Sequence, residues 1–172
     1  MEAVIRVQRL GADQWESYRQ VRLAALTDSP EAYASTLERE QVFDEWTWRS
    51  RLSENGTFLA TRHGVVAGTA TGLFPGEQSS PGEQGGATTR DRMLVAMWVL
   101  PDHRGTGVAQ ALVEAVVGWA REDGAERVLL SVVDTNEVGR RLYERMGFAL
   151  TGRAEPLARD LSRSELELQL RL

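Results

Sequence analysis

A glycine-bearing turn at residues 104–109 is the part of this sequence best suited to bind an anion. It reads Arg104-Gly105-Thr106-Gly107-Val108-Ala109 and stands between an apolar run ending at Leu100 and a helical pattern. The first N–H groups of a helix have no intrahelical acceptor, and the helix dipole is positive at that end. Glycine lets a backbone approach a ligand closely because it has no Cβ, and Arg104 adds a charged fork. The turn therefore predicts a cradle for a phosphate or pyrophosphate.

The residues of this turn do not fit two other common phosphate-binding loops. A nucleoside-triphosphate loop ends in Gly-Lys-Ser/Thr, and no such tripeptide occurs in the chain. A dinucleotide fingerprint requires a third small residue, but Gln110 stands at that position. The fingerprint also requires an acidic residue at a strand end about 20 positions on, whereas Asp123 falls at a helix end. A plain strand-to-helix turn without a ligand remains the alternative.

Two stretches together resemble the signatures of one enzyme family. The pattern Arg-x-x-Gly-x-Ala, directly after Trp98-Val99-Leu100-Pro101, resembles the acetyl-CoA loop of the GCN5-related N-acetyltransferases, the GNAT superfamily. The stretch Asn136-x-x-Gly139-x-x-x-Tyr143-x-x-x-Gly147-Phe148 looks like a second signature of that family. Taken alone, Asn136 is a good helix N-cap and a half-buried Tyr143 is typical of packing. Gly139 departs from the alanine common in the family, and it would allow a ligand to approach closely.

This resemblance implies a chemistry and a set of site residues. An amine would attack the thioester of acetyl-CoA directly in a ternary complex, with acetyl-CoA as co-substrate and no metal. Tyr143 holds the position of the family's general acid, which protonates the departing thiolate. A thiol with a pKa near 8.5 is already a fair leaving group, so the acid is expected to contribute at the low end of about 10² to 10⁴ in rate. The cofactor-binding residues that the resemblance implies are Met97, Trp98, Val99, Arg104, Gly105, Thr106, Gly107, Val108, Ala109 and Asn136.

The sequence does not identify a general base. Many family members carry a glutamate on the central strand, but residues 94–100 contain no carboxylate, and Asp91 comes early on that strand. Glu38, Glu40 and Asp134 are candidates, directly or through water, although each is more typical of a solvated surface residue. We therefore expect a chain of water molecules to remove the proton without a dedicated base.

Composition limits the partners that we expect. The formal net charge of −5 disfavours nucleic acid, and the absence of cysteine excludes a thiolate nucleophile, a disulfide and a cysteine-based metal site. No apolar run approaches the length of a membrane span and no signal peptide is evident, so we expect a cytoplasmic protein without a membrane partner. The expected partner is an amine acceptor, either a small molecule, an aminoacyl group or a peptide, and a homodimer is left open. Transfer of a longer acyl group and a non-catalytic CoA-binding module are the alternatives.

Apolar periodicity predicts the elements that would position these residues. We expect one domain over residues 1–172 with a mixed α/β (α+β) fold: a central, mostly antiparallel sheet of six or seven strands flanked by about four helices. By resemblance, two parallel central strands splay apart. On the last helix, Val138, Leu142 and Met146 are predicted to share an apolar face. The predicted strands are 4–7, 57–61, 65–74, 93–100, 128–133, 148–152 and 166–172, and the helices are one capped by Asp13 and ended by Ser29-Pro30, one around 42–52, one over 109–120 and one that Asn136 opens.

A segment at about residues 75–90 differs in composition from the rest. It is rich in glycine, serine, glutamine and proline, and it contains Pro-Gly-Glu-Gln twice. It offers almost no apolar side chain to bury, so we predict a mobile loop lengthened by a local duplication.

Overall fold

The computed structural model describes residues 4–75 and 90–172. The chain divides into two compact units, unit 1 (Met1–Gly72 and Ala96–Val116) and unit 2 (Leu73–Val95 and Val117–Leu172). Strand β4 (Asp91–Val99) and helix α4 (Val108–Glu122) each contribute residues to both units. Apart from Pro75 and Arg90, the segment predicted to be a mobile loop lies outside the described residues.

The described part of the chain contains seven strands and five α-helices, as the prediction of a mixed α/β fold required. The strands are hydrogen-bonded in the order β1-β2-β3-β4-β5-β7-β6. The β1–β2, β2–β3, β5–β7 and β6–β7 pairs are antiparallel, whereas β4–β5 is parallel. This parallel ladder covers only three residue pairs, from Asp91↔Arg127 to Met93↔Leu129, so it ends well before either strand does.

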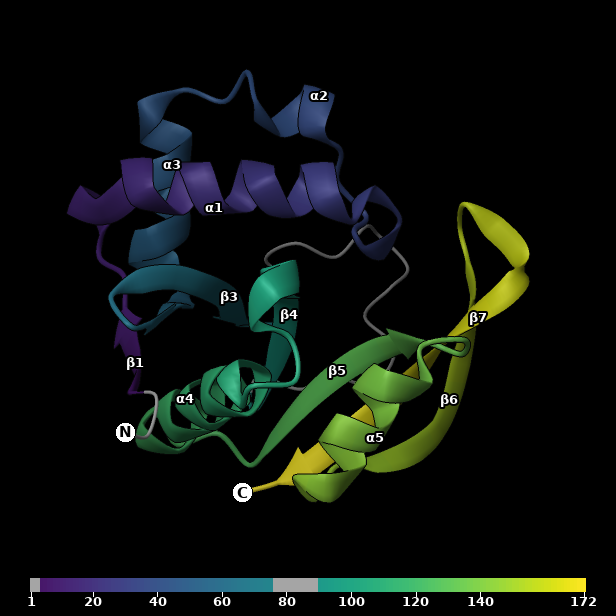
Figure 1. Cartoon of the computed structure of the whole chain (residues 1–172). Helices are drawn as coiled ribbons and strands as arrows, with labels where there is room; N and C mark the ends of the chain where they lie inside the picture. Colours follow the sequence, from purple (N-terminus) through teal and green to yellow (C-terminus); the bar gives the residue numbers. More distant parts are fainter. Residues whose placement is uncertain (1–3, 76–89) are drawn as a thin grey trace. The chain divides into compact units, whose positions relative to one another are not determined.

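Unit 1 begins with a strand, three helices and a hairpin (Figure 1). The hairpin turns at His63 and Gly64, whose φ values of 54° and 79° are both left-handed. Positive φ at both central residues is what a two-residue hairpin turn of this type requires. The elements are β1 (Ile5–Arg9), α1 (Trp15–Asp28), α2 (Leu37–Glu40), α3 (Glu45–Glu54), β2 (Gly56–Arg62) and β3 (Val65–Leu73), with single 3₁₀ turns at Ala12–Gln14 and Pro30–Ala32.

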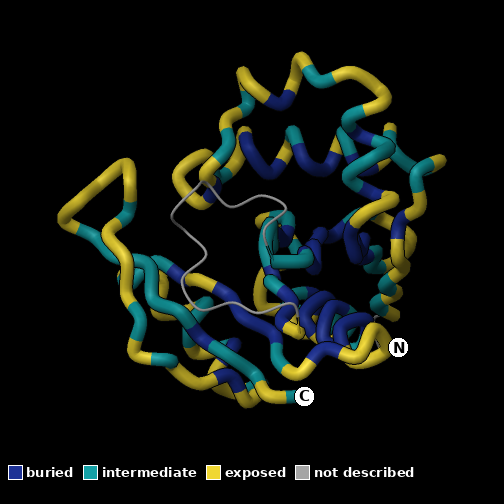
Figure 2. Tube along the Cα trace, turned by 180° about the vertical axis from the view of Figure 1, so that it is seen from behind, coloured by how far each residue is buried: buried dark blue, intermediate teal, exposed yellow. Residues whose placement is uncertain are grey.

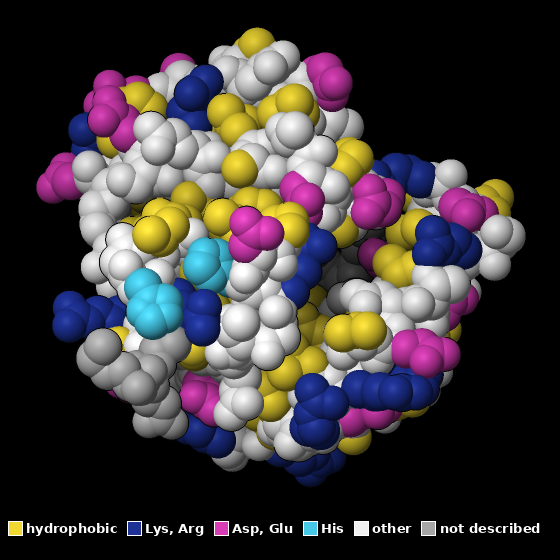
Figure 3. Space-filling model, viewed as in Figure 1, with side chains coloured by type: hydrophobic (Ala, Val, Ile, Leu, Met, Phe, Trp, Pro, Cys, Tyr) yellow, Lys and Arg dark blue, Asp and Glu magenta, His cyan; other side chains and the backbone are white. Residues whose placement is uncertain are grey.

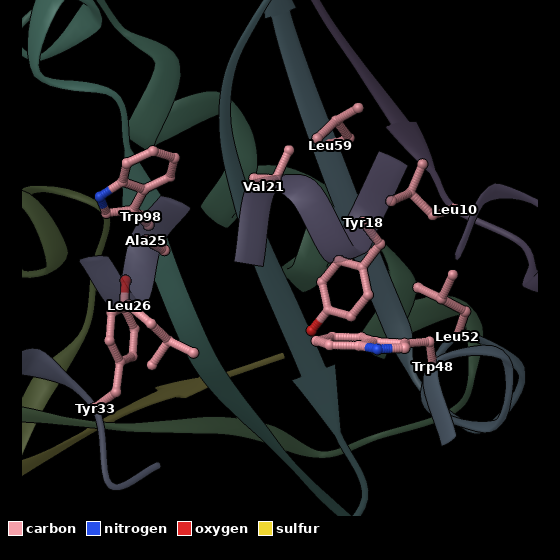
Figure 4. Packing of buried hydrophobic residues seen from close by; sticks show 10 residues of the cluster. All are labelled: Leu10, Tyr18, Val21, Ala25, Leu26, Tyr33, Trp48, Leu52, Leu59 and Trp98. Atoms are coloured by element: carbon pink, nitrogen blue, oxygen red, sulfur yellow. The ribbon is translucent and has the colours of Figure 1, made fainter. Parts of the chain in front are cut away.

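The core of unit 1 is built on one face of α1. Figure 2 shows buried positions recurring along this helix, as expected for an amphipathic helix that packs on one side. The ring of Tyr18 meets the fully buried ring of Trp48 edge-on, with centroids 5.8 Å apart. Figure 4 shows that Trp98 and Tyr33 lie at the other end of the same cluster, beside Ala25 and Leu26. The end of α1 therefore packs against the strand segment that precedes the predicted cradle.

Unit 2 consists of the first part of β4, the second part of α4, and the C-terminal elements (Figure 1). These are β5 (Arg127–Val133), α5 (Glu137–Arg145), β6 (Ala149–Leu157) and β7 (Asp160–Arg171). The β5–β7 ladder runs without a shift from Arg127↔Arg171 to Val133↔Glu165. On β5 the side chains of Val128, Leu129 and Leu130 are buried, whereas most of β7 is intermediate or exposed.

Three local predictions were wrong. Asp13 does not cap α1, because it lies in a 3₁₀ turn and pairs with Arg49, with Nη1 2.9 Å from Oδ1. Val138 is 83% exposed, so the buried side of α5 is centred on Tyr143 instead. The last two strands form a longer hairpin than the predicted strands 148–152 and 166–172. Exposed residues extend β6 to Leu157 and begin β7 at Asp160.

Across residues 4–75 and 90–172, no helix has the length and apolar character needed to span a bilayer.

Candidate functional site

The predicted cradle lies at the end of β4, in the turn that leads into α4. Pro101–His103 form a single 3₁₀ turn, in which the N–H of His103 donates to the Leu100 carbonyl at 2.9 Å. The hydroxyl of Thr106 donates to the His103 carbonyl at 2.6 Å, a hydrogen bond within the turn that stabilises it. The chain is thereby reversed within a few residues, and α4 begins at Val108.

Two glycines give this turn its left-handed backbone. The φ values are 73° at Gly105 and 91° at Gly107, a region that side chains other than glycine adopt at a cost. A Cβ added at Gly105 would meet nothing within 4 Å, so the turn is open there. A Cβ at Gly107 would stand 3.5 Å from the side chain of Ile5. The conformation explains the need for glycine at both positions.

The N–H groups at the start of α4 face away from any internal acceptor. The first intrahelical bond of the helix runs from the N–H of Ala111 to the carbonyl of Gly107, at 3.1 Å. Within the described part of the chain, no backbone carbonyl accepts from Val108, Ala109 or Gln110. Such unsatisfied donors at the positive end of a helix of 15 residues can bind an anion.

Arg104 is held by protein groups on one edge of its guanidinium. Its Nε donates to the Val99 carbonyl at 3.0 Å, and its Nη2 donates to Asp28 Oδ2 at 2.6 Å. The same carboxylate oxygen accepts from the indole of Trp98 at 2.9 Å and from the hydroxyl of Ser29 at 2.7 Å. These hydrogen bonds, of which the one from Trp98 is the strongest influence, lower the pKa of Asp28 to about 2. The sequence did not single out Asp28 as a functional residue, because it stands 70 residues from Trp98 along the chain.

The strand segment before the cradle carries backbone strain. Ala96 has a φ of 52°, which is left-handed and rare for a residue with a Cβ. The next residue, Met97, accepts a hydrogen bond at its carbonyl from the hydroxyl of Tyr33, at 3.4 Å. Trp98 and Val99 are then buried again. A left-handed residue inside a strand redirects the backbone groups that follow it, which here belong to the predicted cofactor-binding residues Met97, Trp98 and Val99.

In unit 2, Asn136 acts as the N-cap of α5. Its Oδ1 accepts from the N–H of Gly139 at 3.0 Å. A Cβ added at Gly139 would lie 2.7 Å from Asn136 Nδ2 and 3.1 Å from its Cγ. The glycine therefore makes room for the capping side chain, which is a different reason from the ligand approach expected from the sequence.

Tyr143 lies in the last turn of α5 and is more buried than predicted. It is 8% exposed, and its ring meets that of Phe148 edge-on with centroids 5.8 Å apart. Burial raises the pKa of Tyr143 to about 12, so the hydroxyl keeps its proton at neutral pH. Because a free thiol has a pKa of about 8.5, complete proton transfer to a thiolate would be uphill by about 5 kcal/mol. The hydroxyl is thus better suited to donate a strong hydrogen bond to the departing sulfur than to transfer its proton completely before the carbon–sulfur bond breaks.

The carboxylates considered as bases have very different environments. Glu40 is fully buried and bonded to Arg22 and Arg51, at 2.8 and 3.0 Å, and so is not the solvated residue expected. Asp91 is also buried, and Arg127 binds both of its oxygens. Both are committed to ion pairs and are unsuited to accept a substrate proton.

Two candidates for the base remain. Glu38 is exposed on α2. Asp134, directly after β5, accepts from the N–H of Ser164 at Oδ2, 3.1 Å away. Its Oδ1 is buried without a hydrogen-bond partner among the described residues. An unpartnered carboxylate oxygen is the property that a base or a water-binding group needs.

Arginine side chains gather over α5 in the space-filling view (Figure 3). All 20 of the Lys+Arg residues of the chain are arginine. On α5, Arg141 pairs with Glu137 and Arg140 with Glu144, each at 3.4 Å and one turn apart. Such exposed pairs contribute little to stability, and they leave the surface of α5 charged.

No group of three or more metal-ligating side chains occurs within residues 4–75 and 90–172. The described groups without an internal hydrogen-bond partner near the predicted site residues include the first N–H groups of α4 and Oδ1 of Asp134.

Together, the mixed sheet and the glycine turn at the start of α4 define an α/β fold in which the first N–H groups of a helix have no internal acceptor. Residues 15–148 match the model of the Acetyltransferase (GNAT) family, and the chain belongs to that family.

Relatives and solved structures agree with this assignment. A mycothiol acetyltransferase of Thermobispora bispora is 31% identical over 144 residues, which are 84% of this chain and 45% of that protein. The streptothricin acetyltransferase of Streptomyces lavendulae is 41% identical over 54 residues, 31% of this chain and 29% of that protein. The chain spans less than half the length of the curated relatives it matches first.

The fold is also shared by solved structures at 18% and 28% identity. The Salmonella typhimurium protein yncA, solved with its cofactor acetyl-CoA, matches with a TM-score of 0.72 at 18% identity, covering 98% of this chain and 94% of that one. A nourseothricin acetyltransferase matches with a TM-score of 0.56 at 28% identity, covering 69% and 65%.

Proposed function

We propose that this chain is an acetyl-CoA-dependent N-acetyltransferase that transfers the acetyl group to a primary amine by direct attack in a ternary complex. The observation that carries the proposal is the turn at Gly105 and Gly107, whose left-handed backbone leaves the first N–H groups of α4 without acceptors. Membership of the GNAT family supports reading this turn as a site for the pyrophosphate of CoA. The relatives named as acetyltransferases support the same class of reaction.

In this proposal, unit 1 binds the phosphates and the thioester. The N–H groups from Thr106 to Ala109 bind the pyrophosphate, with Arg104 beside them. Acetyl-CoA, when bound, supplies the acetyl group as an activated thioester. The backbone N–H groups of Met97 to Val99 stabilise the negative charge that develops on the thioester oxygen during amine attack. The strained backbone at Ala96 directs these donors.

Tyr143 and Asn136 also have roles in this proposal, which membership of the GNAT family supports. The amine nitrogen forms a bond to the carbonyl carbon, the carbon–sulfur bond breaks, and Tyr143 donates its O–H toward the sulfur as negative charge builds there. Asn136 uses Oδ1 to cap α5, and its Nδ2 could donate to a ligand. Its main role is to hold the start of the helix that presents Tyr143.

Removal of the proton from the amine does not require a carboxylate on β4. A lysine-like amine has a pKa of about 10.4, so a fraction of it is neutral near pH 8 and can attack. Water, or Asp134 through water, then accepts the proton that is lost after attack. The expected rate rises with pH, because the neutral fraction of the amine increases.

Binding of CoA by isothermal titration calorimetry tests the cradle. Gly107→Ala places a side chain on a left-handed backbone at the mouth of the turn, and we expect CoA affinity to fall by about 10-fold or more. Gly64→Ala is the matched control, because its φ of 79° imposes similar backbone strain in the β2–β3 hairpin. Equal CoA affinity in both variants would place the binding site elsewhere.

Release of CoA from acetyl-CoA, measured against a panel of amines, tests turnover. The panel contains small amines, an aminoacyl amide and a peptide with a free N-terminus. Faster turnover with a longer acyl-CoA would favour the acyl-chain alternative. CoA binding without turnover on any amine would favour a CoA-binding module that lacks catalysis.

A further inference from the structure

The carboxylate of Asp28 connects the end of α1 to both parts of the proposed site in unit 1. Its Oδ2 accepts hydrogen bonds from the indole of Trp98, the hydroxyl of Ser29 and the guanidinium of Arg104. Trp98 is only 6% exposed, so the carboxylate is fixed to a buried side chain. The Asp28 carboxylate thus links the buried indole of Trp98 to the half-exposed guanidinium of Arg104.

Arg104 is bound at two of its three nitrogens. Nε donates to the Val99 carbonyl and Nη2 donates to Asp28, so the plane of the guanidinium is fixed. Nη1 has no hydrogen-bond partner in the part of the chain that the structure describes. The side chain is 52% exposed, and the residue begins the turn whose N–H groups are unpaired. One edge of the guanidinium is therefore held by the protein while the other is open to a ligand.

We infer that Asp28 is a positioning residue that orients Arg104 so that its open edge binds a phosphate of CoA. The inference rests on the proposed function, because it takes CoA as the ligand of the turn. Asp28 acts through Arg104 and does not itself touch the cofactor. A free arginine side chain loses rotational freedom when it binds, whereas one that is already oriented loses little.

Orienting Arg104 favours CoA binding, but the negative charge of Asp28 disfavours it. A carboxylate beside an anion site repels phosphate. Two substitutions separate orientation from charge. Asp28→Asn keeps an oxygen that can accept from Trp98 and Arg104 but removes the charge, whereas Asp28→Ala removes both. We expect Asp28→Ala to weaken CoA binding by about 2- to 10-fold. We expect Asp28→Asn to bind CoA at least as tightly as the wild-type protein does.

A double-mutant cycle tests whether the effect passes through Arg104. Affinity for CoA is measured by calorimetry for Asp28→Ala, Arg104→Gln and the double variant. Once Arg104 is absent, Asp28→Ala should cause no further loss of affinity. Arg104→Gln should also reduce the dependence of binding on salt concentration, because it removes an ionic contact to phosphate. Asp13→Ala is the control, as Asp13 pairs with Arg49 and carries the same charge.

The outcomes distinguish this inference from the proposed function. Equal losses of affinity from Asp28→Ala with and without Arg104 would overturn the inference, as would an unchanged CoA affinity in Asp28→Ala. A purely structural role would lower the midpoint of thermal unfolding while leaving the affinity of the folded protein unchanged. Failure of the wild-type protein to bind CoA would overturn the proposed function, and the inference with it.

Discussion

Gly68 on β3 lies so close to Trp98 on β4 that a Cβ added to it would stand 2.5 Å from the Trp98 carbonyl oxygen. The same Cβ would lie 3.2 Å from the Cα of Val99 and 3.2 Å from the side chain of Leu112 on α4. Backbone and helix therefore close around this glycine, directly behind the strand segment proposed to stabilise the oxyanion. The absence of one methyl group lets β4 take its position.

We expect Gly68→Ala to destabilise the protein by about 1–3 kcal/mol, because the added carbon can be accommodated only by moving backbone. Gly118→Ala is the matched control, since a Cβ there meets nothing within 4 Å and the residue lies within a helix. This control should stabilise the protein by up to about 1 kcal/mol. Urea unfolding followed by fluorescence measures both changes, and a neutral Gly68→Ala would show that the strand shifts freely.

Glu40 and its two arginines make the fold of unit 1 sensitive to acid. Burial by itself would raise the pKa of Glu40, but the hydrogen bond and charge of Arg22, together with Arg51, outweigh it and hold the pKa below its usual value. The stabilisation is therefore present above the unfolded pKa of about 4.3 and is lost as pH falls through the lower native pKa.

Glu40→Gln should cost about 3–5 kcal/mol, because it leaves the buried guanidinium of Arg22 and the partly buried guanidinium of Arg51 without their counter-charge. Below pH 4, the difference in unfolding free energy between this variant and the wild-type protein should shrink. Glu38→Gln, on the exposed face of the same helix, should have little effect at any pH. Denaturant unfolding at pH 7 and at pH 3.5 compares the three proteins, and a constant difference would contradict the assigned linkage.

Tyr143→Phe tests the proposed role of the phenol in bond breaking. The substitution keeps the ring against Phe148 and deletes only the hydroxyl. We expect kcat and kcat/KM to fall together by about 10- to 10³-fold, with little change in CoA affinity. A raised KM for acetyl-CoA at normal kcat would instead assign the hydroxyl to cofactor binding.

Tyr18→Phe is the control for that experiment, because it also deletes a hydroxyl from a buried ring. It should leave kcat unchanged. With a pKa of about 12, Tyr143 keeps its proton over the range in which the amine becomes neutral. The wild-type rate should therefore rise with pH up to about pH 10 without a decline caused by this tyrosine.

Ala96→Gly should stabilise the protein by about 1 kcal/mol, because glycine adopts a φ of 52° without the clash that a Cβ causes. Ala70→Gly, in the buried part of β3, should destabilise it, since no strain is relieved there and packing is lost. Thermal unfolding of the two variants should give shifts of opposite sign. A loss of stability in Ala96→Gly would show that the backbone there is not strained.

The sequence by itself determined the class of fold, the order of the strands and of the longer helices, and the position of the turn at Gly105 and Gly107. These features depend on local rules: apolar periods set strands and helices, and a left-handed backbone requires glycine. The turn at His63-Gly64 and the helix end at Gly147 follow from the same rules, and the structure gives both glycines a positive φ.

Only the tertiary structure decided which charged side chains are paired and which remain open. Glu40 had the sequence surroundings of a solvated residue, yet it is completely buried because Arg22, 18 residues earlier, and Arg51 supply its partners. Asp28 meets Trp98 and Arg104 across 70 and 76 residues, distances over which no spacing rule applies. The apolar period of a segment predicts which of its faces lies toward the core. An ion pair forms only when packing brings two distant segments together, and the sequence of neither segment alone specifies that packing.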